Sequence, residues 1–381
     1  MHKYWLNFKY AVSLGKPLLI WRLVKTYLGI IFYGKRPLRY VDFAIGYSCN
    51  LKCDHCFATA LEDGTMRRGV PVDKNGDPRK MLPRGGVGRE RITPQEYGRI
   101  VSEAMALGAC NFSFQGGEPT LYPDLLDYIR AAQPSQNVIS VTTNGTLLDR
   151  EKIAALKRAG VDILTISLDS ACAEVHDAFR GMSGTFAKSL ATIKLAKEMG
   201  LHVTVGAVVS HENLYSDDFN QLIKLVTGLD CILFLALASP VGEWANNANI
   251  MITPEDREYL DDLCATHPLV RTDFEANWVD HGCGAMKEII YLTPYGDVLP
   301  CPFLHTSQGN VREQSLTAIR ANTLTNPYFA TYYDRCLAAE DPDYLARYNK
   351  GFYKENGQPL TIGEIHESEI HQREKVGDHS C

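Results

Sequence analysis

Short apolar stretches alternate with longer amphipathic stretches along the chain from residue 40 to about residue 240. The short stretches predict six strands, at 40–46, 110–115, 137–142, 161–168, 202–209 and 231–237. The stretches between them carry apolar residues at helical spacing and predict helices at 94–107, 123–132, 149–159, 185–199 and 217–227. Strands that alternate with helices form parallel sheets. Six such units are fewer than the eight of a closed barrel, so the pattern predicts an α/β fold with a partial (β/α)6 barrel of the TIM type.

The N-terminal region follows a different pattern. Residues 17–33 are strongly apolar but are interrupted by Arg22 and Lys25, which makes the segment too short and too charged to span a bilayer comfortably. No small-residue cleavage site follows it, so a removable signal peptide is not expected. The segment predicts an amphipathic helix. It would either pack across the outside or bottom of the main domain or contact a membrane surface.

The alternation of strands and helices ends beyond residue 240. Two short strands, 288–293 and 298–300, are separated by a Pro-Tyr-Gly-Asp turn and predict a hairpin. Helical segments are expected near 316–322 and 327–337. We therefore divide the chain into an N-terminal helical segment (1–39), a barrel (40–240), a smaller C-terminal domain (241–353) and a polar tail (354–381).

Composition and charge narrow the function classes. Of the 381 residues, 45% are hydrophobic and 22% are charged, as in folded globular proteins. The net charge of −6 provides no basic field, so we expect no nucleic-acid partner. Eleven cysteines in so long a chain are not a disulfide framework. The cysteines indicate a metal site in a reducing compartment, the cytoplasm. The protein would also associate with a membrane if its N-terminal helix contacts lipid.

Three of the cysteines form a tight cluster directly after the first predicted strand. Cys49, Cys53 and Cys56 offer three thiolates from one short loop, and such soft ligands select zinc or iron–sulfur clusters. A structural zinc normally has a fourth local ligand. His55 is the one local candidate, but it lies between two of the cysteines and would have to fold back through the same loop. Three thiolates on a cubane cluster leave one iron open.

Further motifs follow the next predicted strands, at the carboxyl ends where an α/β barrel builds its active site. They are Gly116-Gly117-Glu118-Pro119, Thr143-Asn144-Gly145 and Ser167-Leu168-Asp169-Ser170, and Phe57 directly follows the third cysteine of the cluster. Together with the CxxxCxxC cluster, these motifs resemble those of the radical S-adenosylmethionine (SAM) superfamily. The resemblance covers residues 40–240.

The resemblance implies an enzyme, an oxidoreductase or transferase, with a [4Fe–4S] cluster on the three cysteines and SAM on the open iron. Reductive cleavage of SAM would give a 5′-deoxyadenosyl radical that takes a hydrogen atom from the substrate. A flavodoxin or ferredoxin would supply the electron. The candidate SAM-binding residues are Phe57, Gly116, Gly117, Glu118, Pro119, Thr143, Asn144, Ser167, Asp169, Arg180, Val208 and Val209.

The resemblance also implies roles for several of these residues. Glu118 would accept a hydrogen bond from the ammonium group of SAM, and Arg180 would pair with its carboxylate. Asn144, Ser167 and Asp169 would bind the ribose hydroxyls or the methionyl end, and the two valines would pack on adenine. Taken singly, each motif has a structural explanation: the Gly-Gly-Glu-Pro motif could be a turn, and Ser167 and Asp169 could cap the next helix. Their joint occurrence favours SAM binding.

A second cysteine set lies in the predicted C-terminal domain. Cys283 and the segment from Gly296 to Cys301 resemble the start of the auxiliary-cluster domain called SPASM, or of its shorter twitch form, and Cys336 is a candidate third ligand. Too few cysteines remain for a second auxiliary cluster, so we expect one. The sequence leaves the fourth ligand of this cluster open: it is His305, Cys264, Cys381 or the substrate, or the cluster has no fourth ligand. The alternative is a pair of buried thiols with a coincidental motif.

The sequence restricts the substrate only loosely. We favour a small-molecule, lipid-like or cofactor-precursor substrate, because the first 39 residues are too short for a leader-binding domain and are amphipathic. One alternative is a maturase that modifies a ribosomal peptide or a protein side chain. Another is a non-catalytic iron–sulfur protein for electron transfer or scaffolding, which leaves the strand-end motifs unexplained.

A long segment after the first cysteine cluster also has a predicted role. Residues 62–91 carry eight Lys and Arg against five Asp and Glu, so the segment is locally positive in a negative protein. We expect it to emerge at the mouth of the barrel, where it would steer an anionic group of the substrate and gate the site. The alternative is a solvated surface excursion without a role.

Overall fold

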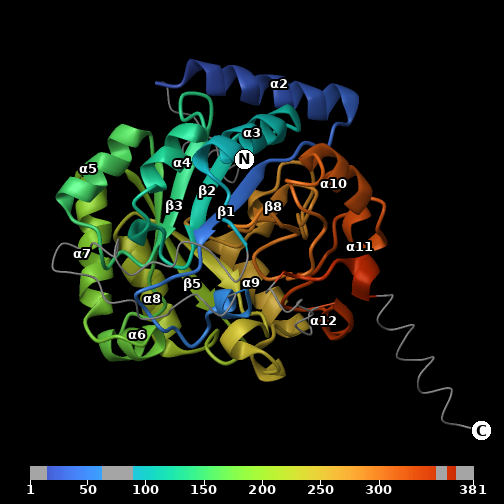
Figure 1. Cartoon of the computed structure of the whole chain (residues 1–381). Helices are drawn as coiled ribbons and strands as arrows, with labels where there is room; N and C mark the ends of the chain where they lie inside the picture. The colour runs from blue at the N-terminus through green and yellow to red at the C-terminus, as the bar shows by residue number, and fades with distance from the viewer. Residues whose placement is uncertain (1–14, 62–88, 349–357, 366–381) are drawn as a thin grey trace, which may run out of the picture.

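The computed structural model describes residues 15–61, 89–348 and 358–365 (Figure 1). Their strands form one sheet in the order β7-β6-β5-β4-β3-β2-β1-β8-β9. The strands are β1 (Tyr40–Gly46), β2 (Asn111–Gly116), β3 (Val138–Thr143), β4 (Ile163–Ser167), β5 (His202–Val209), β6 (Ile232–Leu237), β7 (Val270–Arg271), β8 (Ile289–Leu292) and β9 (Val298–Leu299). Strands β1 to β7 are all parallel to their neighbours. The predicted unclosed barrel is confirmed.

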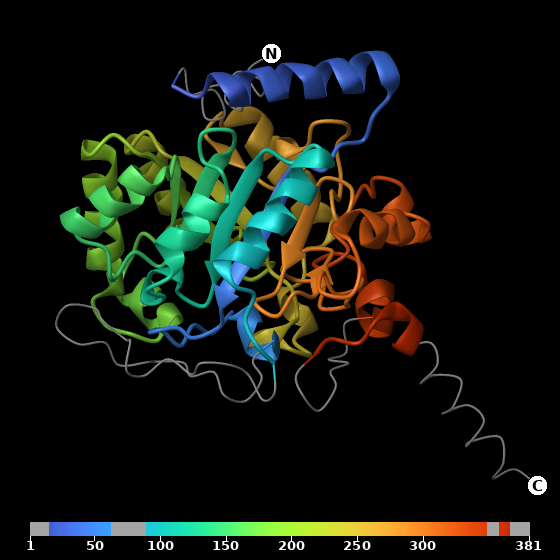
Figure 2. The same ribbon diagram turned by 45° about the horizontal axis from the view of Figure 1, so that its top comes forward.

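Helices surround this sheet, on its outer face and at its ends (Figures 1 and 2). They are α2 (Pro17–Tyr33), α3 (Pro94–Ala106), α4 (Leu125–Ala131), α5 (Arg150–Ala159), α6 (Ala173–Arg180), α7 (Thr185–Glu198), α8 (Asp217–Gly228), α9 (Pro254–Thr266), α10 (Leu316–Thr323), α11 (Pro327–Ala330) and α12 (Pro342–Tyr348). Outward side chains of the strands pack on the helices, as where Phe43 of β1 stacks on Tyr97 of α3 at 4.4 Å between ring centroids. Alternate side chains face the barrel interior.

The predicted hairpin is present and belongs to the same sheet. Strand β8 pairs in parallel with β1, with Tyr40 opposite Ile289, and β9 returns antiparallel to β8. Gly296 in the turn has a φ of 93°, a left-handed conformation that glycine adopts without strain. The hairpin therefore brings Cys301, two residues beyond β9, beside the barrel interior. The predicted domain boundaries stay predictions.

One predicted helix is shorter than expected. Of the segment 327–337, only Pro327–Ala330 is helical. The next residues turn toward the Cys283 segment, where the Cys283 N–H donates to the Tyr333 carbonyl at 2.7 Å. This bridge takes the backbone out of the helix. The sequence reading also missed α6, α9 and α12, although the capping box of Thr253 and Asp256 marks the start of α9.

Helix α2 packs across the amino-terminal ends of the barrel strands (Figure 2). Arg22 donates to the carbonyls of Ala109 and Gln136, and Lys16 pairs with Asp162 at 2.5 Å. The prediction of a helix packed across the bottom of the main domain is confirmed. In the part of the chain that the structure describes, no helix is both long enough and apolar enough to cross a bilayer.

Most of the positive segment predicted to gate the site, namely residues 62–88, lies outside the described residues. Its last two basic residues are described and paired. Arg89 contacts Asp297 and Arg91 contacts Asp124, each at 2.7 Å. Gating and anion steering stay predictions.

Candidate active site

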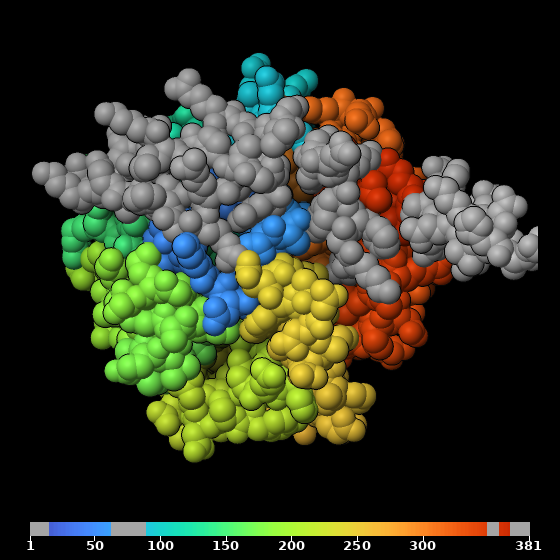
Figure 3. All heavy atoms as spheres, turned by 60° about the horizontal axis from the view of Figure 1, so that its bottom comes forward, coloured from blue at the N-terminus to red at the C-terminus, as the bar shows by residue number. Residues whose placement is uncertain are grey.

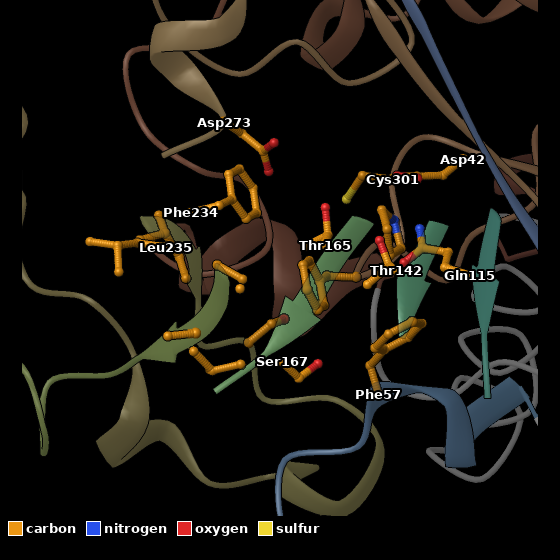
Figure 4. Close-up of a pocket in the computed structure, with 18 of the residues that line it drawn as sticks. Asp42, Phe57, Gln115, Thr142, Thr165, Ser167, Phe234, Leu235, Asp273 and Cys301 are labelled. Atoms are coloured by element: carbon orange, nitrogen blue, oxygen red, sulfur yellow. The ribbon is translucent and has the colours of Figure 1, made fainter. Parts of the chain in front are cut away.

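One cavity of about 380 Å³ lies inside the barrel, and both predicted cysteine sets line it. Figure 4 shows part of its lining, with Cys301 of the second set. Its walls include the carboxyl ends of β1 to β6 and the loops that follow them. Of the predicted site residues, those that line it are Cys49, Cys53, Cys56, Phe57, Gly116, Gly117, Glu118, Thr143, Asn144, Ser167, Arg180, Val208, Cys283, Cys301 and Cys336. The structure thus brings both cysteine sets and most of the strand-end motifs to one place.

The two glycines at the end of β2, Gly116 and Gly117, pack against the segment that leads into the first cysteine cluster. Gly117 N–H donates to the Gly46 carbonyl at 2.8 Å, and Glu118 N–H donates to the Ser48 carbonyl at 3.0 Å. A Cβ on Gly117 would lie 2.2 Å from the Ser48 oxygen. The absence of side chains here therefore allows this segment to pack directly against the backbone that follows β1.

Glu118 links the carboxyl end of β2 to the carboxyl end of β3 through hydrogen bonds. Its buried carboxylate accepts hydrogen bonds from Thr120, from the Thr143 hydroxyl at 2.7 Å and from the Asn144 N–H at 2.8 Å. Burial raises the pKa of Glu118, and these donors oppose that shift. Most of the acceptor capacity of the carboxylate is used within the protein. Its predicted contact with the ammonium group of SAM stays a prediction.

Asn144 positions the first cysteine of the cluster. Its Nδ2 lies 4.0 Å from Cys49 Sγ and donates to Asn50 Oδ1 at 2.9 Å. Its Oδ1 accepts from the Thr146 N–H at 2.9 Å. The side chain is therefore fixed at both ends, next to the sulfur.

Arg180 performs the same task for the second cysteine. From the end of α6, its Nη1 lies 3.8 Å from Cys53 Sγ, while its Nε donates to Asp169 Oδ2 at 2.6 Å. Burial tends to raise the pKa of Asp169, but the charges of Arg180, His55 and His176 and a hydrogen bond from the Val208 N–H together outweigh that effect and lower it. Because Gly181 follows in a left-handed conformation, a Cβ there would lie 2.4 Å from the Lys52 carbonyl. Helix α6 thus packs tightly against the cysteine loop.

Three predicted SAM contacts do not line the cavity: Pro119, Asp169 and Val209. Pro119 begins a short buried 3-10 turn, and Asp169 reaches the site through Arg180. On β5, Val208 lines the cavity and Val209 lies in the hydrophobic core. Successive strand residues face opposite sides of a sheet, so the two valines cannot share one role.

The second cysteine set is assembled from three separate segments. Cys283 is fixed by its bridge to Tyr333, Cys301 follows β9, and the Cys336 N–H donates to Glu340 at 2.7 Å. Burial raises the pKa of the Cys301 thiol, and the charges of the other two cysteines raise it further. The three thiols therefore lie close enough together to affect one another's charge.

The spacing of both cysteine sets fits a polynuclear cluster better than a single ion. Sulfurs on one tetrahedral zinc would lie about 3.8 Å apart. Among the described residues, the one His, Cys, Asp or Glu group with all ligand atoms within 4.8 Å is Asp261, Glu275 and His281, which contains no cysteine. Burial raises the thiol pKa of Cys49 far above its ordinary value, so thiolates here need cationic partners such as cluster irons.

The fourth ligand of the second set stays open. His305 Nε2 lies 2.9 Å from the Pro302 carbonyl, Cys264 belongs to the hydrophobic core, and Cys381 lies outside the described residues. None of the described candidates lines the cavity. In the first cluster, His55 stacks on Phe179 at 4.5 Å and lines the cavity between the cysteines.

Polar residues along the inner walls of the barrel were missed by the sequence reading. They include Asp42, Gln115, Thr142, Thr165 and Asp273 (Figure 4). Their signal is the alternation within each strand, as in β4, where Thr165 and Ser167 alternate with apolar residues. This alternation predicts a strand, but it does not by itself show that the polar side lines a cavity.

Comparison with known proteins agrees with this geometry. Residues 43–226 match the model of the radical SAM superfamily, and residues 283–338 match that of SPASM, an iron–sulfur cluster-binding domain. An AdoMet-dependent heme synthase of Methanosarcina barkeri is 26% identical over 314 residues, covering 74% of this chain and 82% of the relative. A PqqA peptide cyclase of Rhodopseudomonas palustris is 30% identical over 241 residues, covering 60% and 63%.

Solved structures share the fold. Streptococcus suis SuiB bound to its precursor peptide SuiA has a TM-score of 0.56 at 18% identity. The match covers 81% of this chain and 69% of SuiB. At this identity, the likeness supports the fold alone.

Proposed function

We propose, from the premise that this chain belongs to the radical SAM superfamily and carries a SPASM iron–sulfur domain, that it modifies a small molecule held between its two clusters. The chain is an enzyme of radical SAM chemistry, with a [4Fe–4S] cluster, SAM and an auxiliary iron–sulfur group. When bound, the first cluster and SAM supply a 5′-deoxyadenosyl radical that takes a hydrogen atom. The observation that carries the proposal is the single cavity lined by both cysteine sets.

The residues around the cavity would prepare this chemistry. Cys49, Cys53 and Cys56 would hold the catalytic cluster, and Cys283, Cys301 and Cys336 would hold the auxiliary one. Arg180 and Asn144 would orient sulfur ligands from the side of the barrel. The surrounding walls would exclude water from the substrate.

Relatives support two substrate classes. The heme synthase matches most of both chains, which favours a cofactor precursor or another small molecule. The PqqA peptide cyclase favours a peptide, the alternative. The cavity supports the small molecule, because its volume is in the range of small-ligand sites.

Deuterium transfer would separate these classes. The reconstituted enzyme, SAM and a reductant would be incubated anaerobically with an extract from cells of the source organism grown in heavy water. The extract would be divided into fractions below and above about 1 kDa. We expect deuterium in 5′-deoxyadenosine, measured by mass spectrometry, with the small fraction. Deuterium transfer confined to the large fraction would support a peptide or protein substrate and contradict the proposal.

We also propose that α2 docks on an anionic lipid surface. Of the nine large hydrophobic side chains that are exposed in the described part of the chain, seven belong to this helix. They are Leu18, Trp21, Val24, Leu28, Ile31, Phe32 and Tyr33. The helix contains no acidic residue, and Lys25, Lys35 and Arg36 are exposed on or next to it. An apolar face with aromatic residues and flanking cations is typical of interfacial helices.

Vesicle flotation tests this docking. We expect the protein to float with vesicles containing anionic phosphatidylglycerol and more weakly with pure phosphatidylcholine. Trp21→Glu with Phe32→Glu should abolish flotation, whereas Val175→Glu, which changes an exposed apolar residue elsewhere, should not. Absence of flotation would contradict the proposal. Flotation that appears only after residues 1–14 are removed would also contradict it. Dimerisation through α2 instead of vesicle binding would contradict it as well.

A further inference from the structure

The barrel interior is unusually polar on its inner walls. Inward positions of β2 to β5 carry small polar side chains where an α/β barrel is usually filled by Val, Ile and Leu. Those that line the cavity are Gln115, Ser140, Thr142, Thr165, Ser167 and Thr204. Several of them surround the open space in Figure 4. The cavity thus continues from the cysteines toward the beginnings of the strands, where Tyr40 and Asn111 also line it.

Two carboxylates face this inner part of the cavity. Asp42 comes from β1 and Asp273 from the segment after β7, and both line the cavity (Figure 4). Within the described residues, neither carboxylate forms an ion pair within 4.0 Å. Asp42 is buried, whereas Asp273 lines the cavity with much of its side chain accessible. Desolvation by the surrounding protein raises the pKa of Asp42 to about 7 and that of Asp273 to about 6.

The nearby cations do not neutralise the two acids. Arg39 lies 3.2 Å from the buried Glu288, which offsets its charge. Arg271 also lines the cavity and lowers the pKa of Asp273, but the Glu275 carboxylate acts more strongly on Asp273 in the opposite direction. The inner part of the cavity is therefore negative on balance.

Two further atoms lack partners at the same place. Ser140 Oγ and Asn111 Oδ1 are buried without a hydrogen-bond partner, and both residues line the cavity. Ser140 is only 6% exposed. Buried polar atoms are nearly always hydrogen-bonded, so unsatisfied ones that face a cavity indicate a ligand.

We propose that this acidic end of the cavity, lined by Asp42, Asn111, Ser140 and Asp273, binds a protonated nitrogen group of the substrate, an ammonium or a guanidinium. The two carboxylates supply the opposite charge, and the amide and hydroxyl oxygens accept its remaining hydrogens. This inference rests on the proposal that the substrate occupies the barrel cavity. It adds that the substrate is cationic at the end held farthest along the strands from the first cysteine cluster.

Binding of small probes to the holoenzyme tests this inference. The probes are 1,6-diaminohexane and its neutral analogue 1,6-hexanediol, measured by calorimetry at pH 8 with both clusters loaded and SAM bound. We expect the diamine to bind at least tenfold more tightly than the diol. Asp42→Asn and Asp273→Asn should each reduce diamine affinity about tenfold without changing diol affinity.

Control measurements keep this test separate from that of the overall function. Asp127→Asn removes an exposed carboxylate paired with Arg130 on the surface and should leave diamine binding unchanged. Iron content and substrate-free formation of 5′-deoxyadenosine, measured for each variant, report on the clusters alone. Equal binding of diamine and diol would overturn the inference, as would wild-type diamine affinity in both Asn variants. Loss of 5′-deoxyadenosine formation in the wild type would instead contradict the proposed function.

Discussion

The two cysteine sets reach the same cavity by different routes. Cys49, Cys53 and Cys56 come from one loop after β1, and other strand ends hold that loop through Gly117, Asn144 and Arg180. The second set needs three segments that are far apart in the chain, joined by the β8–β9 hairpin and the bridge to Tyr333. A local motif thus builds the first site, whereas tertiary structure builds the second. We expect the two sites to respond differently to substitution.

The largest effect should come from the local set. Replacing Cys49, Cys53 and Cys56 together by Ala should reduce 5′-deoxyadenosine formation to that of a protein-free blank, because no other described thiol lies at this strand end. Iron and sulfide should fall by one cluster and remain on the second set. Mass spectrometry of the nucleoside and iron analysis would measure both. Residual cleavage above the blank would contradict the assignment.

Substitution in the second set should separate substrate turnover from SAM cleavage. In Cys301→Ala or Cys336→Ala, we expect one cluster to be lost while substrate-free 5′-deoxyadenosine formation stays near wild type. Cys231→Ala, which removes a buried thiol of the hydrophobic core, is the matched control and should keep all iron. If Cys231→Ala and Cys301→Ala had the same iron content, the second set would be structural.

A smaller effect is expected at Arg180. Arg180→Lys keeps the charge but loses the planar group that joins Asp169 to Cys53, so SAM cleavage should fall roughly 10- to 100-fold. The reduction potential of the first cluster should shift, since contacts to its sulfurs tune it. Arg150→Lys, in an exposed ion pair with Glu198, should change neither quantity. An unchanged potential would limit Arg180 to a packing role.

The smallest effect concerns the stability of the substrate-free protein. Burial raises the pKa of Asp42 to about 7, so the folded state holds a proton that the unfolded state loses at lower pH. Stability should therefore fall as the pH rises from about 4 to 7. Asp42→Asn removes the free-energy cost of ionising a buried carboxyl group. It should therefore raise the melting temperature by roughly 2–4 °C at pH 8 and by less at pH 5. A lower melting temperature at pH 8 would indicate a structural role for Asp42.

Local patterns predicted most of the fold. The six strands, the hairpin and helix α2 were predicted because apolar periodicity and turn residues act over a few positions. Helix α6 was missed because it is only eight residues long and lies between two motifs. The predicted helix 327–337 failed beyond residue 330 because a distant segment, at Cys283, takes its backbone hydrogen bonds.

The site was predictable to a similar extent. The cysteine sets and strand-end motifs could be found in the sequence, since their spacing is local or resembles that of a family. Asp42 and Asp273 could not, because they are 231 positions apart in the sequence and only the folded sheet brings both to one cavity. The different placement of Val208 and Val209 likewise depends on the strand register, which the sequence alone does not fix.

Electron paramagnetic resonance of the reduced wild-type protein, with and without SAM, tests the two-site account most directly. We predict two cluster signals, of which one shifts on addition of SAM, disappears in the Cys49, Cys53 and Cys56 triple variant and persists in Cys301→Ala. The second signal should be insensitive to SAM and absent from Cys301→Ala. A single cluster signal in the wild type, or loss of the SAM-sensitive signal in Cys301→Ala, would contradict the account.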